Sequence, residues 1–96
     1  MQALDYVDKA KSIIETRKKE IPNHGPYLEI SAQLDYIEKV ISGEEKDRSK
    51  LHKLTLGIYA TKEYEQSDPE LSDALMNVNY IAKQIGKGLR VKLPHE

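Results

Sequence analysis

Histidines are the residues of this chain whose chemistry depends most on spacing, because they act as metal ligands and as acids or bases. The chain has three, His24, His52 and His95, and it has no cysteine. A metal site on a helix needs a second histidine or a carboxylate three or four residues away. Four residues from His52 stand Arg48 and Leu56. We therefore expect no metal site.

Carboxylate pairs are the second possible source of chemistry. Asp5 and Asp8 share a helix face, and Glu63 and Asp68 lie on either side of a predicted turn. Acid–base catalysis needs such groups buried in a cleft that shifts their pKa values, whereas these lie on faces expected to be solvated. There is no nucleophile elbow, dinucleotide motif or phosphate loop, since Gly86-Lys87-Gly88 is too short for one. We expect no catalytic residues, no cofactor and no enzymatic activity.

Composition places the chain among small globular proteins. Ninety-six residues fit one domain, spanning 1–96, and 39% hydrophobic residues suffice for a core. No apolar run reaches the roughly 20 residues of a membrane helix, and the first residues do not resemble a secretion signal. The absence of cysteine fits a reducing compartment. These observations predict a cytoplasmic protein that does not enter a membrane.

Charge is nearly balanced overall but uneven along the chain. The formal net charge is −1, so no global field attracts nucleic acid. Residues 62–73 carry five acids against Lys62, and residues 83–92 carry four basic residues and no acid. Charge runs of this kind are most often solvated helix faces. A partner of opposite charge is the alternative interpretation.

Apolar residues recur at steps of three and four, which predicts an all-α fold. Turn-forming residues around Pro22 and Gly43, and the Asp68-Pro69 pair, separate the helices. The short connections favour a compact antiparallel bundle of about four helices. Beyond it, alternating apolar and basic residues predict a short extended C-terminal tail, 87–96, with Leu89, Val91 and Leu93 packed along the bundle. The predicted helices are 3–20, 26–42, 48–65 and 69–86.

The predicted helix 48–65 carries apolar residues on two opposite sides. Leu51, Leu54 and Ile58 share one side, and Leu56, Ala60 and Tyr64 share the other. A helix of this kind is either central in its fold or uses its second side for a partner. We favour the central position, in which Gly57 permits close approach of another helix.

Large side chains between polar residues mark a candidate contact surface. In the helix 69–86, Met76 and Tyr80 project away from the inner stripe and are flanked by Asp73 and Asn77. Such a pair has the character of a binding hot spot with a polar rim, and cover by a neighbouring helix or by the tail is the alternative. A second candidate stripe lies on the helix 26–42, at Leu28, Ala32 and Tyr36.

Several segments of the chain together resemble one protein family. They are Ser31–Ile37, Asp47–Gly57, Ala60, Lys62–Glu65, Asp68–Ser72 and Gly86–Pro94. In these segments the chain is similar to immunity proteins encoded beside type VI secretion effectors that hydrolyse NAD⁺ and NADP⁺. The resemblance covers nearly the whole length and is strongest from residue 47 onward. It implies an all-helical protein that binds the toxin domain tightly, blocks its active site and catalyses nothing.

The acidic segment suits a toxin pocket that binds a phosphate-rich dinucleotide, because its carboxylates would replace phosphate electrostatically. We expect the apolar anchor to lie beside these acids, although Asp68 and Glu70 also fit a purely structural role at a helix start. A non-enzymatic helical scaffold, or a regulatory module that binds a peptide or dimerises, is the alternative function. The expected partner-binding residues are Glu63, Glu65, Asp68, Glu70, Asp73, Met76, Asn77 and Tyr80.

Overall fold

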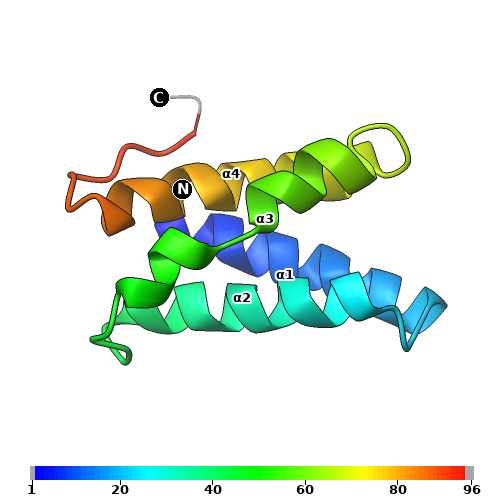
Figure 1. Cartoon of the computed structure of the whole chain (residues 1–96), viewed down its shortest axis with the longest axis horizontal. Coiled ribbons are helices and arrows are strands. Elements are labelled where there is room, and N and C mark those ends of the chain that lie inside the picture. The colour runs from blue at the N-terminus through cyan, green and yellow to red at the C-terminus, as the bar shows by residue number, and fades with distance from the viewer. Residues whose placement is uncertain (1, 95–96) are drawn as a thin grey trace.

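The computed structural model describes residues 2–94, and every regular element in that range is helical. Three helices of 18 residues form the body of the fold (Figure 1). Shorter helical pieces occupy the chain between the second and the third of them. In order, the elements are α1 (Ala3–Glu20), α2 (Gly25–Ser42), the 3₁₀ helix η1 (Ser49–Lys53), α3 (Leu56–Ile58), the π-helix η2 (Tyr59–Tyr64) and α4 (Pro69–Gly86).

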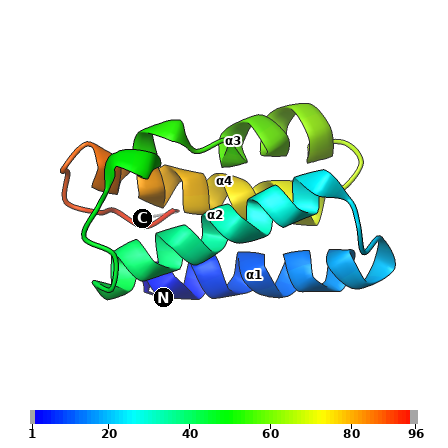
Figure 2. The ribbon, with the colours of Figure 1, turned by 60° about the horizontal axis from the view of Figure 1, so that its bottom comes forward.

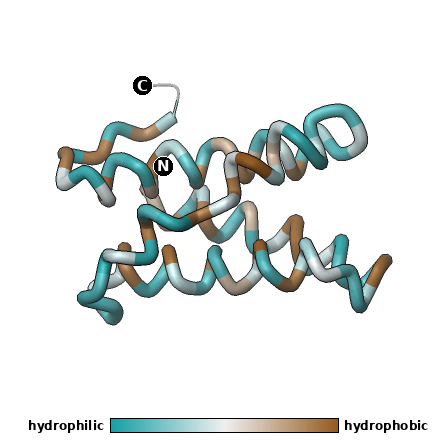
Figure 3. Tube along the Cα trace, in the orientation of Figure 1, coloured by the Kyte–Doolittle hydropathy of each residue, from teal (hydrophilic) through white to brown (hydrophobic). Residues whose placement is uncertain are grey.

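The long helices form an antiparallel bundle in which α1 packs against both α2 and α4. The pieces η1, α3 and η2 lie along α4 on the side away from α1 (Figures 1 and 2). Apolar and polar residues intermix along each long helix (Figure 3), as expected where one face is buried and the other solvated. The described chain measures 35 × 26 × 22 Å along its principal axes. The predicted all-α bundle is confirmed.

The ends of the first two helices follow the expected local rules. The backbone N–H of Gln2 donates to the Asp5 carboxylate at 2.5 Å, which satisfies a donor at the start of α1. Pro26 stands in the first turn of α2, where a missing N–H is harmless. Gly43 ends α2 at φ +89°, a left-handed conformation that glycine adopts without strain.

Helix α4 begins and ends as predicted. Asp68 accepts a hydrogen bond from the backbone N–H of Leu71 at 3.3 Å, and Pro69 follows as the first helical residue. The apolar face is buried, as are Ser72 and Asn79 among the polar residues. Ser72 donates its hydroxyl proton to the carbonyl oxygen of Ala60 at 2.8 Å, which joins α4 to η2.

The predicted continuous helix 48–65 is wrong. The backbone is extended at Leu54, and the chain there passes from η1 to α3. On one straight helix, Leu51 and Leu56 would point about 140° apart, because each residue adds about 100°. The break lets both face the core, where Leu51 is buried and Leu56 is fully buried.

The side chain of Gln33 on α2 holds the break in place. Its amide nitrogen donates to the Thr55 hydroxyl at 2.7 Å, and its carbonyl oxygen accepts from the Thr55 backbone N–H at 2.9 Å. These two bonds replace partners that the interrupted helix no longer supplies.

The segment 56–64 is not buried on both sides, so the expected central position is also wrong. Leu56, Ala60 and Tyr64 form its buried face, while Ile58 is 55% exposed. The expected close approach at Gly57 is confirmed, since a Cβ atom there would lie 2.9 Å from Nδ2 of Asn79 on α4.

The tail runs back along the bundle without forming a strand over 87–94. Gln84 makes two hydrogen bonds of 2.8 Å to the backbone of Lys92, one to its N–H and one to its carbonyl. Val91 and Leu93 are half-buried, but Leu89 is exposed, so its predicted packing is wrong. The expected tail residues 95–96, including His95, lie outside the described residues.

Across the described residues, the helices lack the combination of length and apolar character that crossing a membrane requires.

Candidate partner-binding surface

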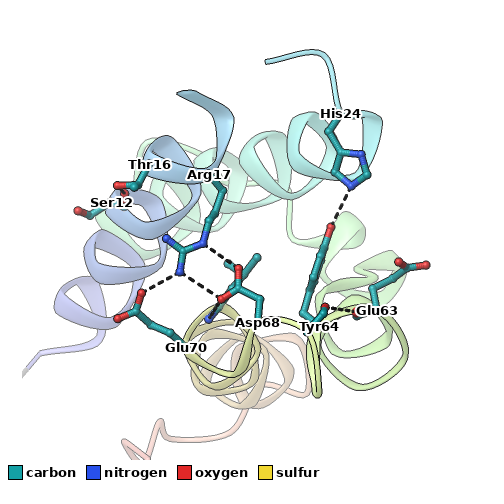
Figure 4. A network of polar contacts seen from close by, with 10 residues as sticks. Ser12, Thr16, Arg17, His24, Glu63, Tyr64, Asp68 and Glu70 are labelled. Atoms are coloured by element: carbon teal, nitrogen blue, oxygen red, sulfur yellow. Dashed lines mark hydrogen bonds and ion pairs between the residues drawn. The ribbon is translucent and has the colours of Figure 1, made fainter. Parts of the chain in front are cut away.

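An ion-pair network joins the acidic segment to α1. Arg17 donates from Nε to Oδ2 of Asp68 at 2.7 Å and from Nη2 to Oδ1 at 3.1 Å (Figure 4). The same Nη2 also donates to Glu70 at 2.9 Å. These hydrogen bonds hold the pKa of the Asp68 carboxyl below its usual range, and they raise the pKa of Arg17 above its own.

Two of the five acids that were predicted to face a partner belong to this network, and the other three do not. Asp68 is largely buried and caps α4, whereas Glu70 is exposed but shares Arg17. Glu63, Glu65 and Asp73 are exposed, and none of the ion pairs among residues 2–94 involves them. The free negative charge of this region therefore belongs to these last three residues.

The predicted anchor lies on the outer face of α4. Tyr80 is 47% exposed and Met76 is 41% exposed, so neither a helix nor the tail covers them. Asn77 is half-buried beside them. Asp73 stands one turn before Met76 and Asn77 on the same helix, so the structure brings one free acid and the anchor onto one surface.

In the second candidate stripe, on α2, one of the three side chains already has contacts within the protein. Leu28 and Ala32 are exposed on α2, but the Tyr36 hydroxyl donates to the carbonyl oxygen of Asp47 at 2.7 Å. The Lys50 ammonium lies 5.8 Å from the centre of the Tyr36 ring. Tyr36 therefore fixes the loop before η1.

An aromatic cluster that the sequence did not reveal joins η2 to the start of α2. The Tyr27 ring lies 4.5 Å from that of His24, edge to face, and 5.9 Å from that of Tyr64, stacked. Burial raises the pKa of Tyr64 to about 12. Tyr27 and Tyr64 belong to the core, so neither is a surface anchor.

The described residues hold no group of three or more histidines and carboxylates arranged to bind a metal. Where a carboxyl pKa departs from its usual value, at Asp47 and Asp68, it is lowered. A buried general acid would have a raised pKa. The lowered pKa of Asp68 follows from its ion pair with Arg17, which keeps this carboxylate charged.

Sequence reasoning also missed a set of hollows around the helix break at Leu54. They lie where the extended backbone at Leu54 separates η1 from α3, a break that the periodic pattern did not predict. Their residues come from α2, η1, α3 and α4.

Comparison with known proteins gives consistent matches over almost the whole chain. The model of the family described as Tsi6 matches residues 2–84. The immune protein Tsi6 of Pseudomonas aeruginosa is 40% identical over 94 residues, which cover 98% of this chain and 100% of that protein.

Solved structures agree with the sequence comparison. The structure of Tse6 in complex with Tsi6 contains a chain that matches with a TM-score of 0.93 and 40% identity, covering 98% of this chain and 100% of that one. The structure of Tsi6 from Pseudomonas aeruginosa matches with a TM-score of 0.85 and 40% identity, covering 100% of both chains.

Proposed function

The chain belongs to the Tsi6 family, and we propose that it is an immunity protein that binds a cognate effector toxin and blocks its active site. The observation that carries this proposal is the 40% identity, over the full length, to a protein named as an immune protein. A Tsi6 protein that is also 40% identical to this chain has been solved in complex with Tse6. A partner protein, rather than a small substrate, is therefore the natural ligand for this fold.

We propose further that the toxin is a type VI secretion effector that hydrolyses NAD⁺ or NADP⁺. The resemblance of Asp47–Gly57 and Gly86–Pro94 to that class of immunity protein supports this, as does the acidic segment 62–73. The protein itself would act in the cytoplasm, where the dinucleotides are consumed, and would catalyse nothing. The lowered pKa of Asp68, whose carboxylate is held charged by Arg17, supports a role in binding rather than in acid catalysis.

In the proposed complex, the acidic residues of the segment 62–73, which we call the acidic surface, face the cationic substrate pocket of the toxin. Glu63, Glu65 and Asp73 supply the free charge, while Asp68 and Glu70 contribute a field that Arg17 partly cancels. The carboxylates speed association because they attract the basic pocket before contact. Buried contacts, which are made only in the complex, slow dissociation. Met76, Asn77 and Tyr80 would provide these contacts next to the acids.

The family resemblance implies a larger toxin gene beside the gene for this protein, and co-expression with that toxin tests the proposed function. The toxin domain alone should deplete cellular NAD⁺ and stop growth, and co-expression of this protein should restore both. A Leu75→Asp variant, which introduces a charge at a fully buried position, serves as the unfolded control and should not protect. Failure of the wild-type protein to protect or to co-purify with the toxin would contradict the proposal.

A further inference from the structure

Three shallow hollows meet at Leu54, which lines all of them. One, of about 410 Å³, lies between α3 and α4, beside Ile58 and Met76. The second, of about 230 Å³, continues from it toward the end of α4 and shares Asn79 and Lys83 with it. The third, of about 440 Å³, lies between α2 and η1. We refer to the three together as the Leu54 surface.

The charged residues of the Leu54 surface are all basic. Neither aspartate nor glutamate lines any of the three hollows. None of the ion pairs among residues 2–94 involves its lysines, and all of these lysines are exposed. Unpaired cations around a concave surface attract a negatively charged ligand. The basic lining residues are Lys50, His52, Lys53, Lys83 and Lys87.

The hollow between α3 and α4 also has exposed apolar side chains, which we call the apolar floor of the surface. Ile58 and Met76 are both exposed and line the same hollow from opposite sides, with the half-buried Leu54 between η1 and α3. Exposed apolar side chains rimmed by polar groups are typical of protein-binding sites. A ligand that uses the whole surface must therefore combine apolar groups with negative charge.

We infer that the Leu54 surface binds an acidic segment of the partner protein. Carboxylates of that segment meet Lys83 and Lys87, and an apolar side chain enters the hollow between Ile58 and Met76. The inference rests on the proposed function, so the partner is the cognate toxin. Nucleic acid fits less well, because the chain has a net charge of −1 and an apolar floor makes no use of a phosphate backbone.

The position of this surface gives it a role in orienting the toxin. The acidic residues Glu63 and Glu65 lie near the end of η2, whereas η1 and the last turns of α4 carry the basic residues at the opposite end of the same layer (Figure 2). A partner with a basic pocket and an acidic segment can then satisfy both surfaces in one orientation only. Like charges meet if the partner is reversed.

Charge reversal with a matched control tests the inference. We compare K83E/K87E with K9E/K19E, which makes the same change at two exposed positions of α1. The probe is the purified toxin domain encoded by the neighbouring gene, and the readout is its association rate at about 50 mM and about 500 mM salt. We expect K83E/K87E to slow association about tenfold at low salt and much less at high salt, with K9E/K19E within about twofold of wild type.

The apolar floor has its own test. Ile58→Ser should raise the dissociation rate of the toxin complex about tenfold, because a hydroxyl replaces an apolar contact. Ile21→Ser is the matched control, since Ile21 is similarly exposed, follows the end of α1 and lines none of the three hollows. Equal dissociation rates for the two variants would overturn the inference.

The outcomes separate the inference from the proposed function. If wild-type protein does not bind the toxin, the proposed function fails and the inference fails with it. If wild-type protein binds and K83E/K87E associates as fast as K9E/K19E, only the inference fails. It also fails if K83E/K87E disrupts a dimer seen by sedimentation, or abolishes binding to duplex DNA, while toxin association is unchanged.

Discussion

Arg17 on α1 and Asp68 at the start of α4 form a bidentate ion pair, with N–O distances of 2.7 and 3.1 Å. Oδ1 of Asp68 also accepts the backbone N–H of Leu71. One carboxylate therefore caps α4 and fastens it to α1. This residue, taken from the sequence as a candidate contact, is also a structural residue.

Asp68→Asn should lower the free energy of unfolding at pH 7 by about 1–2 kcal/mol, because the amide keeps a cap but loses the charged partner of Arg17. Folding lowers the pKa of Asp68. Its stabilisation is therefore complete above the unfolded pKa of about 4 and disappears as the pH falls through the lower folded pKa. Urea unfolding at pH 7 and near pH 2 measures this, and the difference between wild type and variant should shrink at low pH.

The control for that experiment is Glu65→Gln, which removes the same charge at an exposed position outside the ion pairs of residues 2–94. It should change stability by less than about 0.5 kcal/mol. Equal effects of the two variants would show that Asp68 contributes only its net charge.

The two sides of the segment 56–64 should respond differently to the same substitution. Leu56→Asp places a charge at a fully buried position and should cost several kcal/mol, enough to unfold the domain. Ile58→Asp, at a position 55% exposed, should stay folded. Circular dichroism and thermal unfolding distinguish these results, and a folded Leu56→Asp variant would contradict the observed orientation of α3.

The break at Leu54 depends on Gln33. Gln33→Met removes both hydrogen bonds to Thr55 and leaves the backbone N–H of Thr55 without its acceptor. The free energy of unfolding should fall by about 1–3 kcal/mol. The free energy of the local opening that exposes the Thr55 amide should fall by the same amount, so its hydrogen exchange should become faster. Gln66→Met, in an exposed position, is the control. Unchanged exchange at Thr55 would mean that the break is stable without Gln33.

The long helices were predictable because their signals are local. The Asp68-Pro69 pair and Gly43 fix helix ends through their own backbone preferences, and apolar periodicity identifies the buried faces. The break was not predictable in the same way. Leu51 and Leu56 lie on opposite faces of the predicted helix. The break between them is held by hydrogen bonds from Gln33 to Thr55, 22 residues later in the chain, and no local pattern predicts such a contact.

The candidate site was predictable in part for the same reason. The exposure of Met76 and Tyr80 follows from the periodicity of α4. The pairing of Asp68 with Arg17 joins residues 51 positions apart and has no sequence pattern. The hollows around Leu54 depend on the break and were likewise not visible in the sequence.

Tyr80→Ala should weaken toxin binding by at least about 2 kcal/mol, roughly a 30-fold rise in Kd, if Tyr80 is the proposed anchor. Because Tyr80 is 47% exposed, the unfolding free energy should change little. Calorimetry of the variant with the toxin domain measures the affinity, and Ile21→Ala, at an exposed apolar residue after α1, is the control. Unchanged affinity for Tyr80→Ala, together with an unchanged association rate for E63K/E65K, would place the interface elsewhere.

We propose that this chain inhibits a dinucleotide-hydrolysing toxin by binding it. The most direct measurement is the rate of NAD⁺ hydrolysis by the toxin domain as purified wild-type protein is added, with protein alone as the blank. We expect a linear fall in rate that reaches zero at one equivalent, and no hydrolysis by the protein alone. Full toxin activity in the presence of excess folded protein, or NAD⁺ hydrolysis by the protein itself, would contradict it.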